Sequence, residues 1–190
     1  MSADTRNKIL HAAFTVLSRQ GYENTSVKEI AEEAGVAQGL VHYYFKSKQV
    51  LVLAVLAEVC KTMELKGVEG EAGAMAAFDN FKELLRNQRD TNALYIQLLG
   101  VGVHDSDIGA GILDFVRRDR GHVQEIAAQV LAEREMDPTP ARAIASAVWA
   151  AILGIIAQSV IDPDFKVDET VDALAAMSLS AVFAPVQSQQ

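Results

Sequence analysis

The placement of proline is the feature that most limits the fold of this chain. All four prolines lie at positions 138, 140, 163 and 185, so the first 137 residues contain none. Proline disrupts helix interiors, and no run rich in Val, Ile or Thr shows the sustained alternation typical of strands. Apolar residues recur instead at helical spacing along most of the 190 residues. The pattern predicts an all-α protein of about nine or ten helices.

Charge is distributed unevenly along the chain, whose formal net charge is −8. Residues 1–50 carry six basic and five acidic residues, whereas residues 51–190 carry eleven basic and twenty acidic residues. The excess of acid therefore lies outside the N-terminal segment. Phosphate binding needs only a local basic surface, so this balance permits nucleic-acid binding by residues 1–50.

Several classes of site lack support in the sequence. The single cysteine, Cys60, excludes an intrachain disulfide and is interpreted as a small core residue, although a redox sensor is conceivable. The four histidines show no metal-ligand spacing, and no GxSxG or phosphate-binding glycine loop occurs. We therefore expect no enzyme, no metal and no cofactor. The polar N-terminus shows no secretory signal, which favours the cytoplasm.

The N-terminal segment contains the pattern of three short, well-delimited helices. Ser26 and Glu29 have the spacing of a capping box at the start of the second helix, and Gly35 ends it. A third helix, Gln38–Phe45, follows a tight turn, with Tyr44 and Phe45 expected to face the core. Two helices joined by a turn containing glycine and braced by a preceding helix form the layout that places the last helix in the DNA major groove.

The remaining helices are expected to be longer. Ser47 is predicted to cap a helix over residues 48–65, and three glycines in residues 66–73 predict a loop or break. The predicted helices after the third cover residues 48–65, 74–88, 92–103, 107–135, 139–161 and 168–184. The helix over residues 107–135 is expected to be either continuous or interrupted near Gly121.

The stretch GYENTSVKEIAEEAGVAQGLVHYYFKSKQVL, residues 21–51, resembles the signature of the tetracycline-repressor (TetR) family. The resemblance covers about residues 5–55. It implies a helix-turn-helix DNA-binding domain over residues 1–47 and a helical effector-binding and dimerisation domain over residues 48–190, connected by helix 48–65. It also implies a homodimeric repressor that binds a palindromic double-stranded DNA operator and releases it when a small-molecule effector binds.

The resemblance assigns DNA contacts to particular residues. Ser26 and Lys28 correspond to phosphate contacts, and Lys48 to another. The base-reading and neighbouring positions at the third helix are Gln38, Gly39, Leu40, His42 and Tyr43. Independently of the family, a Gln side chain pairs with adenine through two hydrogen bonds, and Leu suits a thymine methyl group.

Two positions depart from the family pattern. Ala37 stands where a capping Ser or Thr is common, which forgoes roughly 1 kcal/mol of capping energy. His42 stands where Tyr is usual, so that contact is expected to be weaker or sensitive to pH.

The C-terminal part offers apolar and aromatic residues for an effector pocket between helices. For each of them ordinary core packing is the more frequent role. The candidates for the pocket are Met63, Phe78, Phe81, Tyr95, Leu99, His104, Phe115 and Trp149.

Residues 143–161 contain no charged side chain, so a membrane span must be considered. The preferred interpretation is a soluble helix buried on all sides, with one side meeting a second copy of the chain through small residues. No membrane partner is therefore expected. The predicted dimer interface comprises Ala147, Ala150, Ala151 and Gly154 of this helix and Leu174, Met177 and Phe183 of the last helix.

Two other classes of protein remain open at this stage. The first is a helical small-molecule carrier or interaction protein that keeps the N-terminal module only as structure. The second is a membrane-associated helical protein, which depends on residues 143–161 alone. The net charge and Ala37 favour the carrier, whereas Ser26, Lys28, Gln38 and Lys48 together favour DNA binding.

Overall fold

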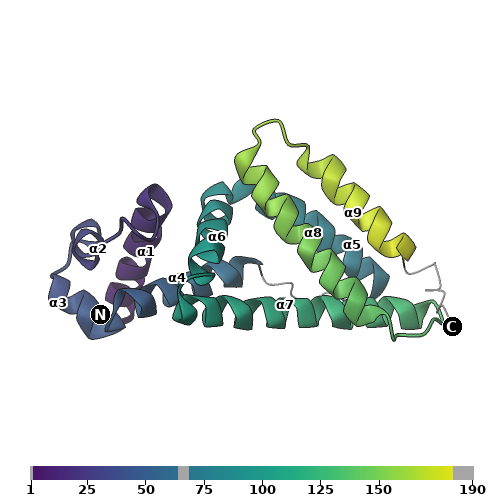
Figure 1. Cartoon of the computed structure of the whole chain (residues 1–190), viewed down its shortest axis with the longest axis horizontal. Coiled ribbons are helices and arrows are strands. Elements are labelled where there is room, and N and C mark those ends of the chain that lie inside the picture. The colour runs from purple at the N-terminus through teal and green to yellow at the C-terminus, as the bar shows by residue number, and fades with distance from the viewer. Residues whose placement is uncertain (1, 64–68, 182–190) are drawn as a thin grey trace. The chain divides into compact units, whose positions relative to one another are not determined.

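The computed structural model describes residues 2–63 and 69–181, and every regular element in those residues is a helix (Figure 1). The nine helices in the described residues confirm the predicted all-α class and agree with the expected number of about nine or ten. They are α1 Ser2–Gln20, α2 Val27–Ala34, α3 Gln38–Phe45, α4 Lys48–Met63, α5 Gly70–Asn87, α6 Arg89–Gly102, α7 Ser106–Glu133, α8 Ala141–Ile161 and α9 Val167–Ala181.

The chain divides into two packing units. The first contains residues 1–63 and 90–115, and the second contains residues 64–89 and 116–190. The predicted functional boundary after residue 47 lies inside the first unit, between α3 and α4, and stays a prediction.

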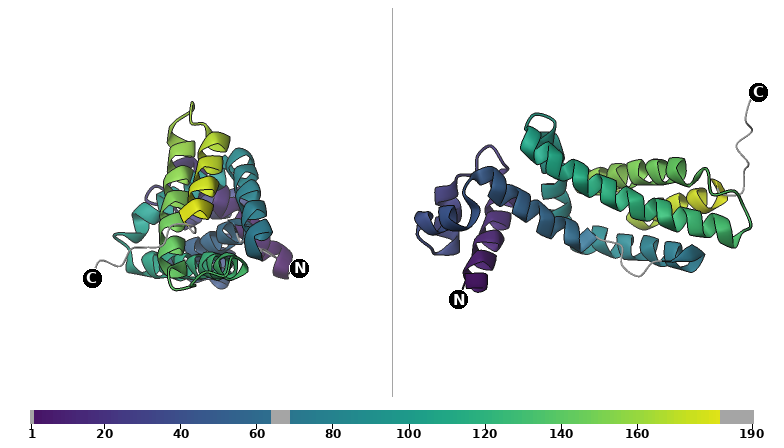
Figure 2. Two further views of the ribbon diagram at one scale, coloured as in Figure 1. Left: turned by 90° about the vertical axis from the view of Figure 1, so that its right-hand side faces the viewer. Right: turned by 90° about the horizontal axis from the view of Figure 1, so that it is seen from below.

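The core of the first unit forms around α1, which packs against α2 and α4, while α3 packs against α2 and α4. The right-hand view of Figure 2 shows these helices from a further direction. Fully buried apolar side chains at helical spacing give α1 one continuous inner face, because positions three or four residues apart share a face. The inner residues of α1 include Ile9, Ala13, Val16 and Leu17.

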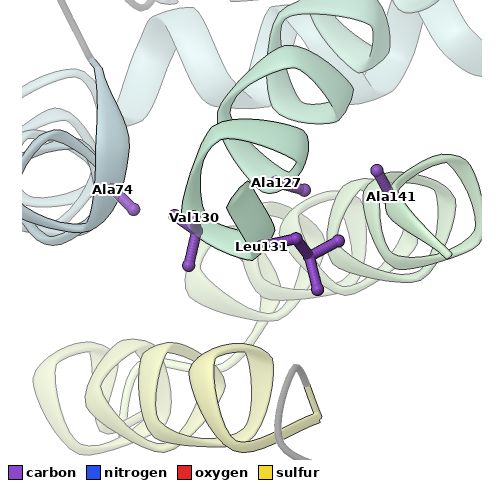
Figure 3. Close-up of a cluster of buried hydrophobic side chains, with 5 residues drawn as sticks. All are labelled: Ala74, Ala127, Val130, Leu131 and Ala141. Atoms are coloured by element: carbon purple, nitrogen blue, oxygen red, sulfur yellow. The ribbon is translucent and has the colours of Figure 1, made fainter. Parts of the chain in front are cut away.

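The second unit is built from α5, the C-terminal part of α7, α8 and α9, with α9 packed against both α5 and α8. Ala74 of α5, Val130 and Leu131 of α7 and Ala141 of α8 belong to one buried cluster (Figure 3). Small side chains at three of the five buried positions of this cluster allow close packing of the helices.

The start of α5 differs from the prediction. Residues 70–73 belong to α5 and not to a loop, because α7 supplies the capping groups. Gly70, at φ 60°, donates its N–H to Oε1 of Gln129 at 2.9 Å, and the N–H of Glu71 donates to Oε2 of Glu133 at 2.9 Å. These side chains satisfy two amides that a helix start leaves free.

The structure decides two points about the long helices. α7 continues through Gly121 without a break. In the single chain α8 is buried along one side only, with Ala145, Val148 and Ile155 inside and Ala147, Ala150 and Gly154 exposed. By length and composition alone, α8 is long and apolar enough to cross a membrane, a property that it shares with core helices of soluble proteins.

Candidate nucleic-acid interface

The start of α2 is held by the predicted capping box. Oγ of Ser26 accepts the N–H of Glu29 at 3.2 Å, and the N–H of Ser26 donates to Oε2 of Glu29 at 2.9 Å. The hydroxyl of Ser26 also donates to Oε2 of Glu29 at 2.7 Å. This hydrogen bond, together with that from the N–H of Ser26, holds the pKa of the Glu29 carboxyl below its usual value. The box confirms the sequence prediction and holds the exposed Ser26 and Lys28 at the first turn of α2.

The turn between α2 and α3 also follows the prediction. Gly35 adopts φ 65° and ends α2, and the N–H of Val36 donates to the carbonyl of Ala31 at 3.0 Å. Ala37 precedes the first residue of α3 and provides no side-chain cap, as expected from its methyl side chain. The two helices are therefore joined by a short, hydrogen-bonded turn.

α3 has two faces of different chemistry. Val41 and Phe45 are almost fully buried, and Tyr44 is half-buried. The opposite face is exposed, and Tyr43 keeps 69% of its surface accessible. The exposed face consists of Gln38, Gly39, Leu40, His42 and Tyr43, which are the five α3 residues that the sequence predicted at the DNA surface.

Lys46 is a cation beside this face that the sequence analysis did not select. Its ammonium lies 5.7 Å from the centroid of the Tyr43 ring, and Tyr43 packs edge-on against Tyr44 at 5.2 Å. Lys46 adopts φ 57° after the end of α3, a region that non-glycine residues rarely occupy. Its position between two helices was visible in the sequence, but the direction of its side chain was not.

The other predicted cations have different surroundings. Lys28 is exposed and lies 3.8 Å from Oε1 of Glu32, an ion pair worth little in water. Lys48 is half-buried at the start of α4, with its ammonium 4.2 Å above the ring of Tyr22. Burial lowers the pKa of the Lys48 ammonium, and the carboxylates of Glu23 and Glu29 oppose that effect. Ser47 caps α4 as predicted, accepting the N–H of Val50 at 3.2 Å.

The predicted effector residues are divided between the two units. In the first unit Tyr95 and Phe115 are buried with ring centroids 5.6 Å apart, whereas His104 is exposed. A shallow cavity of about 400 Å³ in this unit lies along α1 and α2 and touches none of the eight predicted residues. The first unit also holds Met63, the last residue of α4, and the half-buried Leu99, and the second unit holds Phe78, Phe81 and Trp149, all half-buried.

Asn92 on α6 is a buried polar residue that the sequence analysis missed. Its side chain is fully buried, and among the described residues neither its amide nitrogen nor its amide oxygen has a hydrogen-bond partner. Such a group is costly to bury and calls for an explanation. Its position among the apolar residues of α6 was the only signal in the sequence.

The predicted dimer residues that the structure describes lie at or near the surface of the second unit. Ala147, Ala150 and Gly154 are exposed on α8, and a Cβ on Gly154 would meet no atom within 4 Å. Met177 of α9 is 66% exposed. Ala151 and Leu174 are half-buried, and Phe183 lies outside the described residues.

Helix order and the exposed α3 face define a protein with an N-terminal helix-turn-helix module. Residues 9–55 match the sequence profile of the family described as bacterial regulatory proteins, tetR family. Residues 9–55 therefore resemble the N-terminal module of that family. It is 41% identical over 63 residues to the uncharacterized HTH-type transcriptional regulator YvdT of Bacillus subtilis, a match that covers 33% of this chain and 32% of YvdT. This chain thus spans about a third of that relative's length.

Solved structures extend the likeness of fold to nearly the whole chain. A TetR transcription regulator from Haloarcula marismortui superposes with a TM-score of 0.82 at 18% identity, covering 94% of this chain and 98% of the other. A protein from Saccharomonospora viridis, whose structure contains choline, superposes with a TM-score of 0.74 at 23% identity, covering 92% and 95% of the two chains. At these identities the likeness shows the fold alone.

Proposed function

We propose that this chain is a transcriptional repressor that binds a palindromic double-stranded DNA operator as a homodimer and releases it when a small-molecule effector binds. The exposed face of α3 carries this proposal, because it presents polar and aromatic side chains on a short helix held by α2 and α4. The second helix of such a unit enters the major groove with its N-terminal residues at the base edges. The tetR family match covers these helices.

Base reading is assigned to the first turn of α3. Gln38 pairs through its amide with N6 and N7 of adenine, and Leu40 contacts a thymine methyl group. Both side chains are exposed, and Gly39 between them leaves room for the backbone to approach the bases. His42 and Tyr43 contact the backbone or bases from the next turn.

Phosphate contacts are assigned to Ser26 and Lys28 at the start of α2 and to Lys48 at the start of α4. These groups lie at helix N-termini, where backbone amides and the helix dipole favour anions. Lys46 adds a further cation beside α3. Phosphate contacts set the position and salt dependence of the complex, whereas base contacts set its sequence.

The dimer is assigned to the exposed faces of α8 and α9. Ala147, Ala150 and Gly154 lie on one side of α8 and allow a second α8 to approach closely, since their side chains are small. Met177 supplies exposed apolar surface on the neighbouring helix. Two pairs of these helices form a four-helix interface across a two-fold axis, which matches a palindromic operator.

An effector is expected to bind among the buried aromatic residues. The choline-containing neighbour supports ligand binding by this fold. In the first unit, the buried Tyr95 and Phe115 are the strongest of the predicted residues, and Asn92 adds an amide for hydrogen bonding. Binding that favours one arrangement of α4 changes the separation of the two α3 helices and lowers operator affinity. We place the protein in the cytoplasm, where the DNA is.

Selection of bound fragments from the source genome tests the proposal. The full chain should enrich a palindrome whose half-sites lie about 34–36 Å apart or a multiple of that distance. A salt titration on the enriched fragment should show log affinity falling linearly with log salt concentration. The same selection carried out with the Gln38→Ala variant should recover fragments that show no base preference at one base pair of each half-site.

Two outcomes would contradict parts of the proposed function. If no fragment is enriched and Gln38→Ala and Lys48→Ala behave as the wild type on random DNA, the module is structural and the carrier alternative is favoured. If a palindrome is enriched and the chain sediments as a monomer on and off DNA, the dimer assignment is wrong while DNA binding stands.

A further inference from the structure

Tyr22 lies in the corner between α1 and α2, residues 21–26, and contacts two other parts of the first unit. Its ring lies 4.2 Å from Nζ of Lys48, and its hydroxyl donates a long hydrogen bond of 3.4 Å to Oδ2 of Asp105. At the preceding Gly21, a Cβ would stand 3.7 Å from Oε1 of Gln97 on α6. Tyr22 therefore joins the first turn of α4 to the corner between α6 and α7, residues 103–105.

Asp105 is itself held at the start of α7. Its Oδ1 accepts the N–H groups of Asp107 and Ile108, each at 3.1 Å, so the carboxylate caps the helix. Ile108 is fully buried, which anchors this first turn in the core. Oδ1 of Asp105 is thus bound to the first turn of α7, while Oδ2 accepts the hydrogen bond from Tyr22.

Lys48 gains a defined position from the ring. A cation over an aromatic face is attracted by the ring quadrupole, and the half-burial of Lys48 strengthens that attraction. A lysine side chain otherwise loses much rotamer freedom when it binds an anion. An aromatic ring that already restricts the lysine side chain lowers the entropic cost of binding the anion. The ammonium still has donors for a phosphate on the side away from the ring.

We propose that Tyr22 is a positioning residue for the phosphate contact of Lys48, and that its tie to Asp105 makes this contact depend on the corner between α6 and α7. The inference rests on the proposed DNA binding. It names a regulatory contact between the start of α7 and the DNA surface, formed by three side chains of the first unit.

A double-mutant cycle with Tyr22→Leu and Lys48→Ala tests the positioning role. The probe is the double-stranded fragment enriched by the genomic selection, titrated with salt. In the wild-type background Tyr22→Leu should weaken binding about tenfold, as expected for losing a hydrogen bond to a charged group. It should also reduce the slope of log affinity against log salt by about 0.9 per bound protomer. In the Lys48→Ala background, Tyr22→Leu should change neither quantity.

Tyr22→Phe tests the tie to Asp105, because it keeps the ring and removes only the hydroxyl. It should weaken binding less than Tyr22→Leu, by about twofold to threefold, because the hydrogen bond to the Asp105 carboxylate is long at 3.4 Å and therefore weak. Its effect should also vanish in the Lys48→Ala background. Lys46→Ala is the matched control, since it removes a nearby cation that does not contact Tyr22. Its effect should add to that of Tyr22→Leu.

Equal losses from Tyr22→Leu with and without Lys48 would overturn the proposal, because they would indicate a role in packing alone. Unchanged binding by Tyr22→Leu would overturn it while DNA binding stood. A wild-type chain that bound no fragment would remove the proposed function itself. An NMR measurement without DNA tests the contact between Tyr22 and Lys48 directly. The ε-methylene protons of Lys48 should show an upfield ring-current shift in the wild type and in Tyr22→Phe but not in Tyr22→Leu. Absence of this shift in the wild type would overturn the contact.

Discussion

α3 and α8 each have one face buried in their own unit and one face in solvent, but the exposed faces differ in chemistry. On α3 the exposed residues include Gln38, His42 and Tyr43, with Lys46 and Lys48 close in the chain. On α8 they are mainly small and apolar. Polar groups flanked by cations suit phosphates and base edges, whereas small aliphatic side chains allow close approach of another helix. Exposure alone therefore identifies a surface that is available for contact, and the chemistry of its side chains indicates the kind of partner.

Ala150→Arg should have the largest effect, because it places a charge in the centre of the exposed α8 face. If two copies meet there, burying the unpaired guanidinium should cost about 3 kcal/mol or more and dissociate the dimer. Sedimentation equilibrium at micromolar concentration should show a monomer. Gln124→Arg, on an exposed position of α7, is the control and should leave the dimer intact. A dimer that survives Ala150→Arg would mean that α8 faces solvent in the assembly.

Gln38→Ala should have the next largest effect and should act on sequence preference. Loss of the paired amide contact should remove about 1–3 kcal/mol of discrimination at one base pair. Lys28→Ala is the comparison, because losing a phosphate contact should weaken binding to all sequences equally. Competition binding with single-base variants of the operator separates the two. If the two variants gave the same profile, α3 would not read bases through Gln38.

Ala37→Ser should give a smaller gain in stability. Ala37 precedes the first residue of α3 and provides no side-chain cap, and a serine hydroxyl there should add about 0.5–1 kcal/mol. For a chain of this size the melting temperature should rise by about 1–4 °C. Ala57→Ser, at an exposed position within α4, is the control and should give no gain. An unchanged melting temperature would show that another group already satisfies the first amides of α3.

Ser26→Ala should have the smallest effect, which depends on pH. The Glu29 carboxyl has a lowered pKa in the folded chain, so its contribution to stability is present above its unfolded pKa and is lost as pH falls through the folded value. The stability lost in Ser26→Ala should therefore be larger at neutral pH than at about pH 3. Urea unfolding at both pH values measures this difference, and an equal loss at both would mean that the carboxylate does not contribute.

The features predicted correctly from sequence depend on residues close in the chain. The capping box of Ser26 and Glu29 lies within four residues, and the glycine end of α2 lies within one turn. Periodicity likewise placed Phe45 inside, where it is almost fully buried. Prediction was poorer where a side chain distant in the sequence determines the local structure. α5 begins at Gly70 because Gln129 and Glu133 of α7 bind its first amides.

The sequence by itself determined the helices of the N-terminal module, their caps and the side chains on the exposed face of α3, since each depends on interactions within a few residues. Tertiary structure decided where the Lys48 ammonium lies, because the ring of Tyr22 belongs to another corner of the chain. It also decided which side of α8 stays exposed. That helix is apolar almost all round, so only the contacts of its own unit select the buried side.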